Sequence, residues 1–171
     1  DYIFLECTSQ TTPFSFITNF TDGRKVIIVK PDEAIIYKTP LLQSHQNFQH
    51  TKATIKVDNQ GAIQTNILVK NSGEFYDMCE PLSRYDQEEM MKNIKKRYDL
   101  IRDISTLQYE LKDNKKDIIY TESYNVKTNP VVKKMGNQYI LPVNIIHPLV
   151  HIPKKYQNRK FDFAIERGYT M

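Results

Sequence analysis

The stretch ATIKVDNQGAIQTNILV, residues 53–69, decides the fold of this 171-residue chain. Apolar and polar side chains alternate on both sides of a turn at residues 58–61. Alternation at every second residue is typical of a strand with one buried face, so the stretch predicts a β-hairpin. A hairpin with one apolar face is not stable alone, and another element must cover it.

The element that covers the apolar face of this hairpin is predicted downstream, at residues 86–102. Asp86 can cap the N-terminus of a helix, and Glu89 stands three residues later, where a capping-box partner is expected. The apolar side chains that follow at helical spacing are Met90, Met91, Ile94, Tyr98 and Ile101. Most lysines of the segment fall on the other side, so we expect one long amphipathic helix of about four turns.

A second alternating segment occupies residues 107–126, with a turn predicted at residues 113–116. One face of its second strand carries Ile118, Tyr120, Glu122, Tyr124 and Val126. We interpret the two tyrosines as core packing, and a carbohydrate- or peptide-binding surface is the alternative. No β-α-β alternation indicates a parallel sheet. The predicted class is α+β and β-rich, with antiparallel hairpins and the helix packed on one face.

Residues 1–50 break this pattern and predict a separate unit. The strands expected in it cover residues 2–7, 24–30 and 34–38. The polar, unpatterned stretch from residue 39 to residue 50 indicates a linker, which makes residues 51–171 the second, β-rich domain.

Composition places the chain among ordinary folded proteins. It is 40% hydrophobic and 26% charged, which argues against disorder. Its apolar runs, such as residues 26–29, are far shorter than the ~20 residues of a membrane-spanning helix, so no transmembrane segment is expected. The net charge of +4 is mild, and it argues only weakly for an anionic partner.

Two short motifs near the start of the chain carry a resemblance. They are LECTSQ at residues 5–10 and NFTDGR at residues 19–24. Together they resemble the end of the transglutaminase-like core of bacterial exported proteins. The resemblance implies that Glu6 occupies the place of the acid in a Cys-His-Asp triad, although Asp is commoner there. It also implies that the catalytic Cys and His lie upstream.

Later stretches resemble the domain of unknown function that follows this core. They are GNQYILPVN at residues 136–144 and NRKFDF at residues 158–163. The resemblance implies a non-catalytic accessory domain that packs against the papain-like core of its parent chain. It also implies a bacterial protein in the periplasm or outside the cell, and it implies no cofactor.

Three functions remain open at this point. The first is the accessory, protein-interaction domain just described. The second is a part of a cysteine peptidase or amidase in which Glu6 orients an upstream catalytic His, because a carboxylate can fix the imidazole tautomer. The third is a stand-alone protein- or glycan-binding β domain that offers a strand edge near Phe161 and Phe163 for strand addition. In each case we expect no catalysis by this chain alone.

Candidate binding residues gather near the end of the chain. A basic cluster precedes the two phenylalanines, and its members are Lys154, Lys155, Arg159 and Lys160. Such a run is usually a solvated loop, and the chain lacks the strongly basic footprint of a nucleic-acid binder. His147 and His151 are four residues apart, but two histidines are too few for a closed metal site, so no metal is expected.

The two cysteines are expected to remain free thiols, because Cys7 and Cys79 do not form a CxxC spacing and are too few for a disulfide scaffold. Cys7 adjoins Glu6 in a predicted strand, so their side chains should point to opposite faces. The chain opens directly on an apolar run, and we expect its natural N-terminus to lie upstream. The apolar strands of residues 1–40 then need a cover, which makes a homodimer one expected arrangement.

Overall fold

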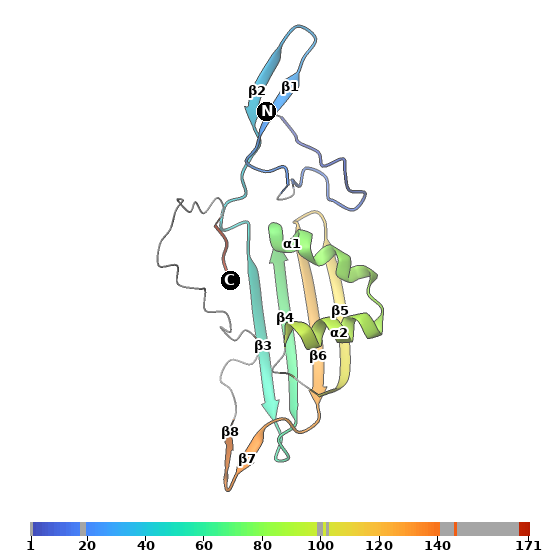
Figure 1. Ribbon diagram of the computed structural model, residues 1–171, viewed down its shortest axis with the longest axis vertical. Helices are drawn as coiled ribbons and strands as arrows, with labels where there is room; N and C mark the ends of the chain where they lie inside the picture. Colours follow the sequence, from blue (N-terminus) through green and yellow to red (C-terminus); the bar gives the residue numbers. More distant parts are fainter. Residues whose placement is uncertain (1, 18–19, 99–100, 102, 141–145, 147–167) are drawn as a thin grey trace, which may run out of the picture.

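The centre of the molecule is a four-stranded antiparallel sheet with helices on one face (Figure 1). The computed structural model describes residues 2–17, 20–98, 101, 103–140, 146 and 168–171. The strands are β3 (Gln49–Val57), β4 (Ile63–Ser72), β5 (Ile104–Asn114) and β6 (Ile119–Thr128). Their spatial order is β3-β4-β6-β5, so the two predicted hairpins lie side by side and pair through β4 and β6. The predicted α+β, β-rich class is confirmed.

Three short helical elements follow β4 and cover one face of this sheet (Figure 1). They are α1 (Glu74–Cys79), the 3-10 turn η1 (Glu80–Arg84) and α2 (Gln87–Arg97). Along β4 and β6 every second side chain points toward them and is buried. Met90 and Ile94 of α2 are completely buried against that face. The core therefore lies between the helices and one side of the sheet.

The start of α2 is confirmed, and its predicted length is wrong. Asp86 accepts a hydrogen bond from the backbone of Glu89 at 2.8 Å, and Glu89 accepts one from the backbone of Asp86 at 3.1 Å. The helix then ends at Arg97 after 11 residues instead of continuing to residue 102. Tyr98 leaves the helical region, and its carbonyl accepts a hydrogen bond from the backbone of Ile101 at 2.8 Å before β5 begins at Ile104. Both side chains still reach the core, which is why the apolar spacing outlasts the helix.

Residues 1–50 contain the expected hairpin but not the expected strand at residues 2–7. The hairpin of β1 (Lys25–Val29) and β2 (Ala34–Lys38) is present and projects beyond the end of the main sheet (Figure 1). The strand predicted at Tyr2–Cys7 is absent, and Ile3 and Leu5 are exposed there. No described strand pairs with this segment, so its apolar run has no sheet to join. Phe16 packs edge-on against Tyr76 of α1, with ring centroids 5.5 Å apart.

The end of the chain returns to the main sheet. Thr170 forms a parallel bridge with Phe48 beside the start of β3. A small hairpin of β7 (Lys133–Met135) and β8 (Gln138–Ile140) precedes it in the chain. The last predicted strand, around Phe161 and Phe163, lies outside the described residues. Among the helices of the described residues, none is long and apolar enough to cross a membrane.

Candidate functional site

Glu6, the predicted triad acid, lies in an irregular segment and is held by hydroxyl groups. One carboxylate oxygen accepts hydrogen bonds from the backbone and side chain of Thr8, at 3.2 and 2.5 Å. The other accepts one from the hydroxyl of Thr21 at 3.1 Å. The structure thus brings together the two motifs at residues 5–10 and 19–24. Cys7 is exposed beside Glu6 and forms no disulfide.

The candidate binding residues near the end of the chain lie outside the described residues, as do the two histidines for which no metal was expected. These are His147, His151, Lys154, Lys155, Arg159, Lys160, Phe161 and Phe163. Within the described ranges, no group of three or more His, Cys, Asp or Glu side chains could hold a metal ion.

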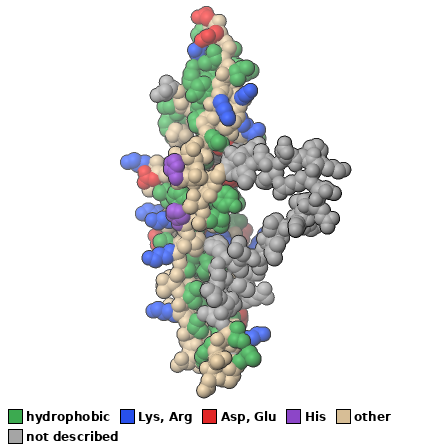
Figure 2. Space-filling model, turned by 90° about the vertical axis from the view of Figure 1, so that its left-hand side faces the viewer, with side chains coloured by type: hydrophobic (Ala, Val, Ile, Leu, Met, Phe, Trp, Pro, Cys, Tyr) green, Lys and Arg blue, Asp and Glu red, His purple; other side chains and the backbone are tan. Residues whose placement is uncertain are grey.

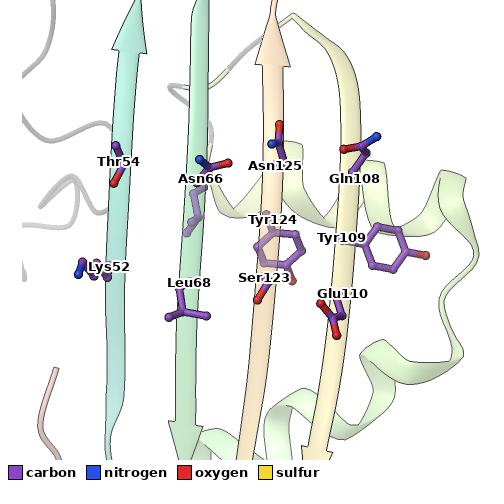
Figure 3. Close-up of a pocket in the computed structure, with 11 residues that line it drawn as sticks. Lys52, Thr54, Asn66, Leu68, Gln108, Tyr109, Glu110, Ser123, Tyr124 and Asn125 are labelled. Atoms are coloured by element: carbon purple, nitrogen blue, oxygen red, sulfur yellow. The ribbon is translucent and has the colours of Figure 1, made fainter.

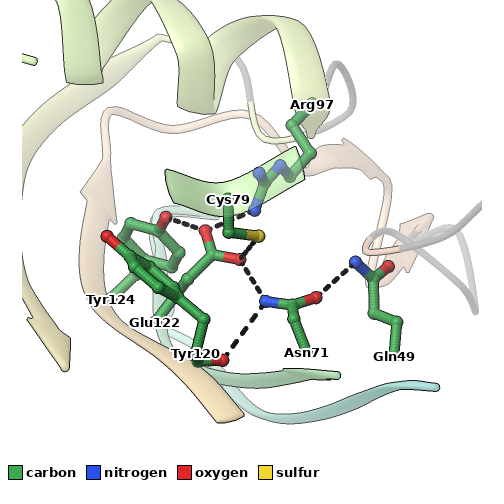
Figure 4. Close-up of polar contacts among 7 residues, drawn as sticks. All are labelled: Gln49, Asn71, Cys79, Arg97, Tyr120, Glu122 and Tyr124. Atoms are coloured by element: carbon green, nitrogen blue, oxygen red, sulfur yellow. Dashed lines mark hydrogen bonds and ion pairs between the residues drawn. The ribbon is translucent and has the colours of Figure 1, made fainter. Parts of the chain in front are cut away.

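A polar cluster around Glu122 is buried between the helices and the sheet (Figure 4). Arg97 of α2 pairs with one oxygen of the fully buried Glu122 carboxylate at 2.6 Å, and the hydroxyl of Tyr124 donates to the same oxygen. Asn71 of β4 donates to the other oxygen at 2.8 Å, and the Cys79 thiol lies 3.6 Å from it. Side chains from α1, α2, β4 and β6 therefore meet at the carboxylate of Glu122.

The electrostatics of this cluster keep the thiol protonated. Burial raises the pKa of Cys79 well above its usual range, and the charge of Glu122 raises it further, while Arg97 opposes part of the shift. Burial followed by the Glu122 charge likewise raises the pKa of Tyr124. The nucleophilic form of cysteine is the thiolate, so Cys79 is not activated at neutral pH. The arrangement fixes α1 and α2 to the sheet.

The opposite face of the main sheet carries none of the described helices and presents two rows of side chains, all polar except Leu68 (Figure 3). Strand register aligns the rows across all four strands. The first row consists of Thr54, Asn66, Asn125 and Gln108, and the second of Lys52, Leu68, Ser123 and Glu110. A hollow on this face is lined by both rows. We call the side of the sheet that carries these rows the open face.

Positive charge lies within and beside the two rows. Side-chain alternation places five lysines on the open face, namely Lys52, Lys56, Lys70, Lys112 and Lys127. All five are exposed, and Glu110 of the second row is the acid among the paired positions of the open face. Figure 2 shows Lys and Arg side chains projecting one above another along one side of the molecule. Amide and hydroxyl groups at the centre, flanked by cations, form a surface suited to a hydrogen-bonding anion.

Sequence reasoning did not identify the open face or the buried cluster as sites. It treated the lysine, threonine and amide positions of the strands as the polar side of an alternating pattern. Only the strand order places the polar side of the first hairpin next to that of the second. For the cluster the available signal was Glu122, an acid in the middle of a strand face that is otherwise apolar or aromatic.

Comparison with known proteins gives no indication of function, so the function is inferred from the geometry of the open face and the buried cluster. No protein-family model matches the chain, and no curated protein or solved structure matches it significantly.

Proposed function

We propose that this chain is a non-catalytic binding domain that holds an acidic polysaccharide on the open face of its main sheet. The observation that carries the proposal is the first row of amide and hydroxyl side chains on a sheet face that also carries five exposed lysines. We further propose that the domain is an accessory part of an exported bacterial transglutaminase-like protein, in the periplasm or outside the cell. The motifs around Glu6 and at residues 136–144 support that context.

The state of the candidate catalytic groups supports a binding role. Cys79 is buried and its pKa is raised, so at neutral pH it is a thiol beside a carboxylate. Both oxygens of Glu6 accept hydrogen bonds from threonines of its own region. Neither group presents an activated nucleophile or an acid-base pair of the kind that amide chemistry requires.

The chemistry of the open face favours an acidic polysaccharide over other anionic partners. Asn66, Asn125 and Gln108 offer amides that both donate and accept, which matches sugar hydroxyl groups. Lysine is a point charge that suits a carboxylate or sulfate, and no arginine stands in the rows to form a bidentate contact with phosphate. Single-stranded nucleic acid needs aromatic platforms, and protein interfaces are depleted of lysine and serine.

The test is a calorimetric titration of the chain with polygalacturonate, a polymer of uronic acid, with neutral dextran as the reference polymer. We expect binding of polygalacturonate alone. Lys52→Glu and Lys70→Glu on the open face should each weaken binding by about tenfold or more, because each replaces an attraction by a repulsion. Matched reversals on the helix side, Lys92→Glu and Lys95→Glu, change the net charge equally and should leave the affinity close to that of the wild type.

Two results would contradict the proposal. Equal losses from open-face and helix-side variants would mean that net charge alone attracts the polymer. Stronger binding of single-stranded DNA than of polygalacturonate, with the same variants affected, would assign the open face to nucleic acid.

A further inference from the structure

The β1–β2 hairpin has one covered face and one uncovered face. Antiparallel register pairs Ile27 with Ile36 and Val29 with Ala34, so these four side chains point to the same side. Ile27, Val29 and Ile36 are 69%, 80% and 76% exposed. On the other side Tyr37 is packed by Tyr2 and Phe4, at ring distances of 5.2 and 5.6 Å.

An exposed set of β-branched side chains on a projecting hairpin indicates an interaction surface. A two-stranded hairpin is marginal in water, and contiguous apolar patches of this kind usually meet a partner. The hairpin extends beyond the main sheet (Figure 1), so the uncovered face is accessible to another molecule. We call Ile27, Val29, Ala34 and Ile36 the hairpin patch.

Charge along the hairpin indicates what the partner is. Lys25 and Lys38 face each other at the base, on the same side as the hairpin patch. The turn at the opposite end carries Asp32 and Glu33, and Glu33 is bonded to Lys30 at 2.7 Å. Asp32 therefore leaves the tip acidic, while the base is basic. A surface with an apolar centre and opposite charges at its two ends is complementary to itself when turned by 180°.

We propose that the hairpin patch binds the hairpin patch of a second copy of this chain in a twofold-symmetric dimer. The two hairpins lie face to face and antiparallel, so Asp32 of each copy meets Lys25 and Lys38 of the other. The hairpin spans about five residues at about 3.4 Å per residue, roughly 17 Å, which allows apolar contact at the centre and charge contact at both ends. This dimer is independent of any ligand on the open face.

Light scattering and sedimentation equilibrium over a wide concentration range test the proposal on the whole chain. We expect a reversible dimer for the wild type and a monomer for Ile36→Lys. Leu68→Lys is the matched control, because it places the same charge at an exposed aliphatic position on the main sheet, and it should remain dimeric. Circular dichroism of each variant checks that the main sheet is intact.

A charge exchange tests the geometry of the dimer. Lys38→Glu should raise the dissociation constant by more than about tenfold, because it brings two acids together. Adding Asp32→Lys to that variant should restore most of the affinity. A wild type that is monomeric at every concentration would overturn the proposal and leave the hairpin patch to a different partner. A dimer that survives Ile36→Lys, or a double variant without recovery, would also overturn it.

Discussion

At the scale of single residues, Glu122 and Arg97 form the contact on which the helix-to-sheet packing depends. Arg97→Met removes the cation and leaves a fully buried carboxylate beside the Cys79 thiol. Losing one partner of a buried ion pair costs roughly 3–5 kcal/mol, and we expect about 3 kcal/mol because Arg97 keeps some contact with solvent. Urea denaturation measures the loss. Lys95→Met, on the exposed side of the same helix, should change stability by less than about 0.5 kcal/mol.

An Arg97→Met protein as stable as the Lys95→Met control would contradict this role of the pair. The sequence could not have identified the pair, because Arg97 ends a run of lysines that are exposed in α2. Arg97 differs from the neighbouring lysines only because α2 packs against β6 and brings it next to Glu122.

The contact of Asn47 with the start of α1 is equally long-range: its side chain accepts a hydrogen bond from the backbone of Glu74 at 3.0 Å.

At the scale of elements, the N-terminus of α2 was predictable and its end was not. The capping box depends on two residues three positions apart, which a sequence displays directly. The end depends on where β5 must begin, and that is set by the pairing of β5 with β6. The absent strand at residues 2–7 has the same explanation, since an apolar run becomes a strand only beside a partner strand.

Asp86 gives a prediction at this scale. Asp86→Ala removes the side-chain oxygen that accepts the backbone hydrogen bond of Glu89, and loss of such a cap costs about 1 kcal/mol. Asp86→Asn retains an oxygen in the same place and should lose no more than a few tenths of a kcal/mol. Thermal or urea denaturation of both variants measures the difference. Equal losses for the two variants would mean that the charge, and not the cap, stabilises the helix.

At the scale of the whole molecule, the buried phenols and the thiol predict how stability depends on pH. Burial, followed by the charge of Glu122, raises the pKa of Tyr124, and burial also raises the pKa of Cys79 and takes that of Tyr120 to about 12. In the unfolded chain these groups titrate near 10 and, for the thiol, near 9. The unfolded state therefore releases protons first as the pH rises. The stabilisation that these protonated groups give to the folded state is complete below about pH 9, and it is lost progressively as the pH rises above that value.

Urea midpoints measured from about pH 7 to about pH 11 should fall steeply in the upper part of that range. Tyr124→Phe removes one titrating group and should make the alkaline fall shallower. A midpoint that stays constant to about pH 11 would mean that these groups are not buried as described.

Much of the architecture was predictable from alternation and capping, and the site was not. The two hairpins and the helix between them follow from periods of two and 3.6 residues, which are local properties of the chain. The open face arises because β4 pairs with β6, and no local pattern specifies that pairing. The lysines and amides were visible in the sequence, but their alignment into rows exists only in the assembled sheet.

The most direct test of the central claim is NMR of the side-chain amide groups during titration with polygalacturonate. We predict that the signals of Asn66, Asn125 and Gln108 shift in a saturable way. The amide of Asn71, on the buried side of β4, is the internal reference and should not move. Unchanged signals from the three open-face amides, or shifts no larger than that of Asn71, would contradict binding on the open face.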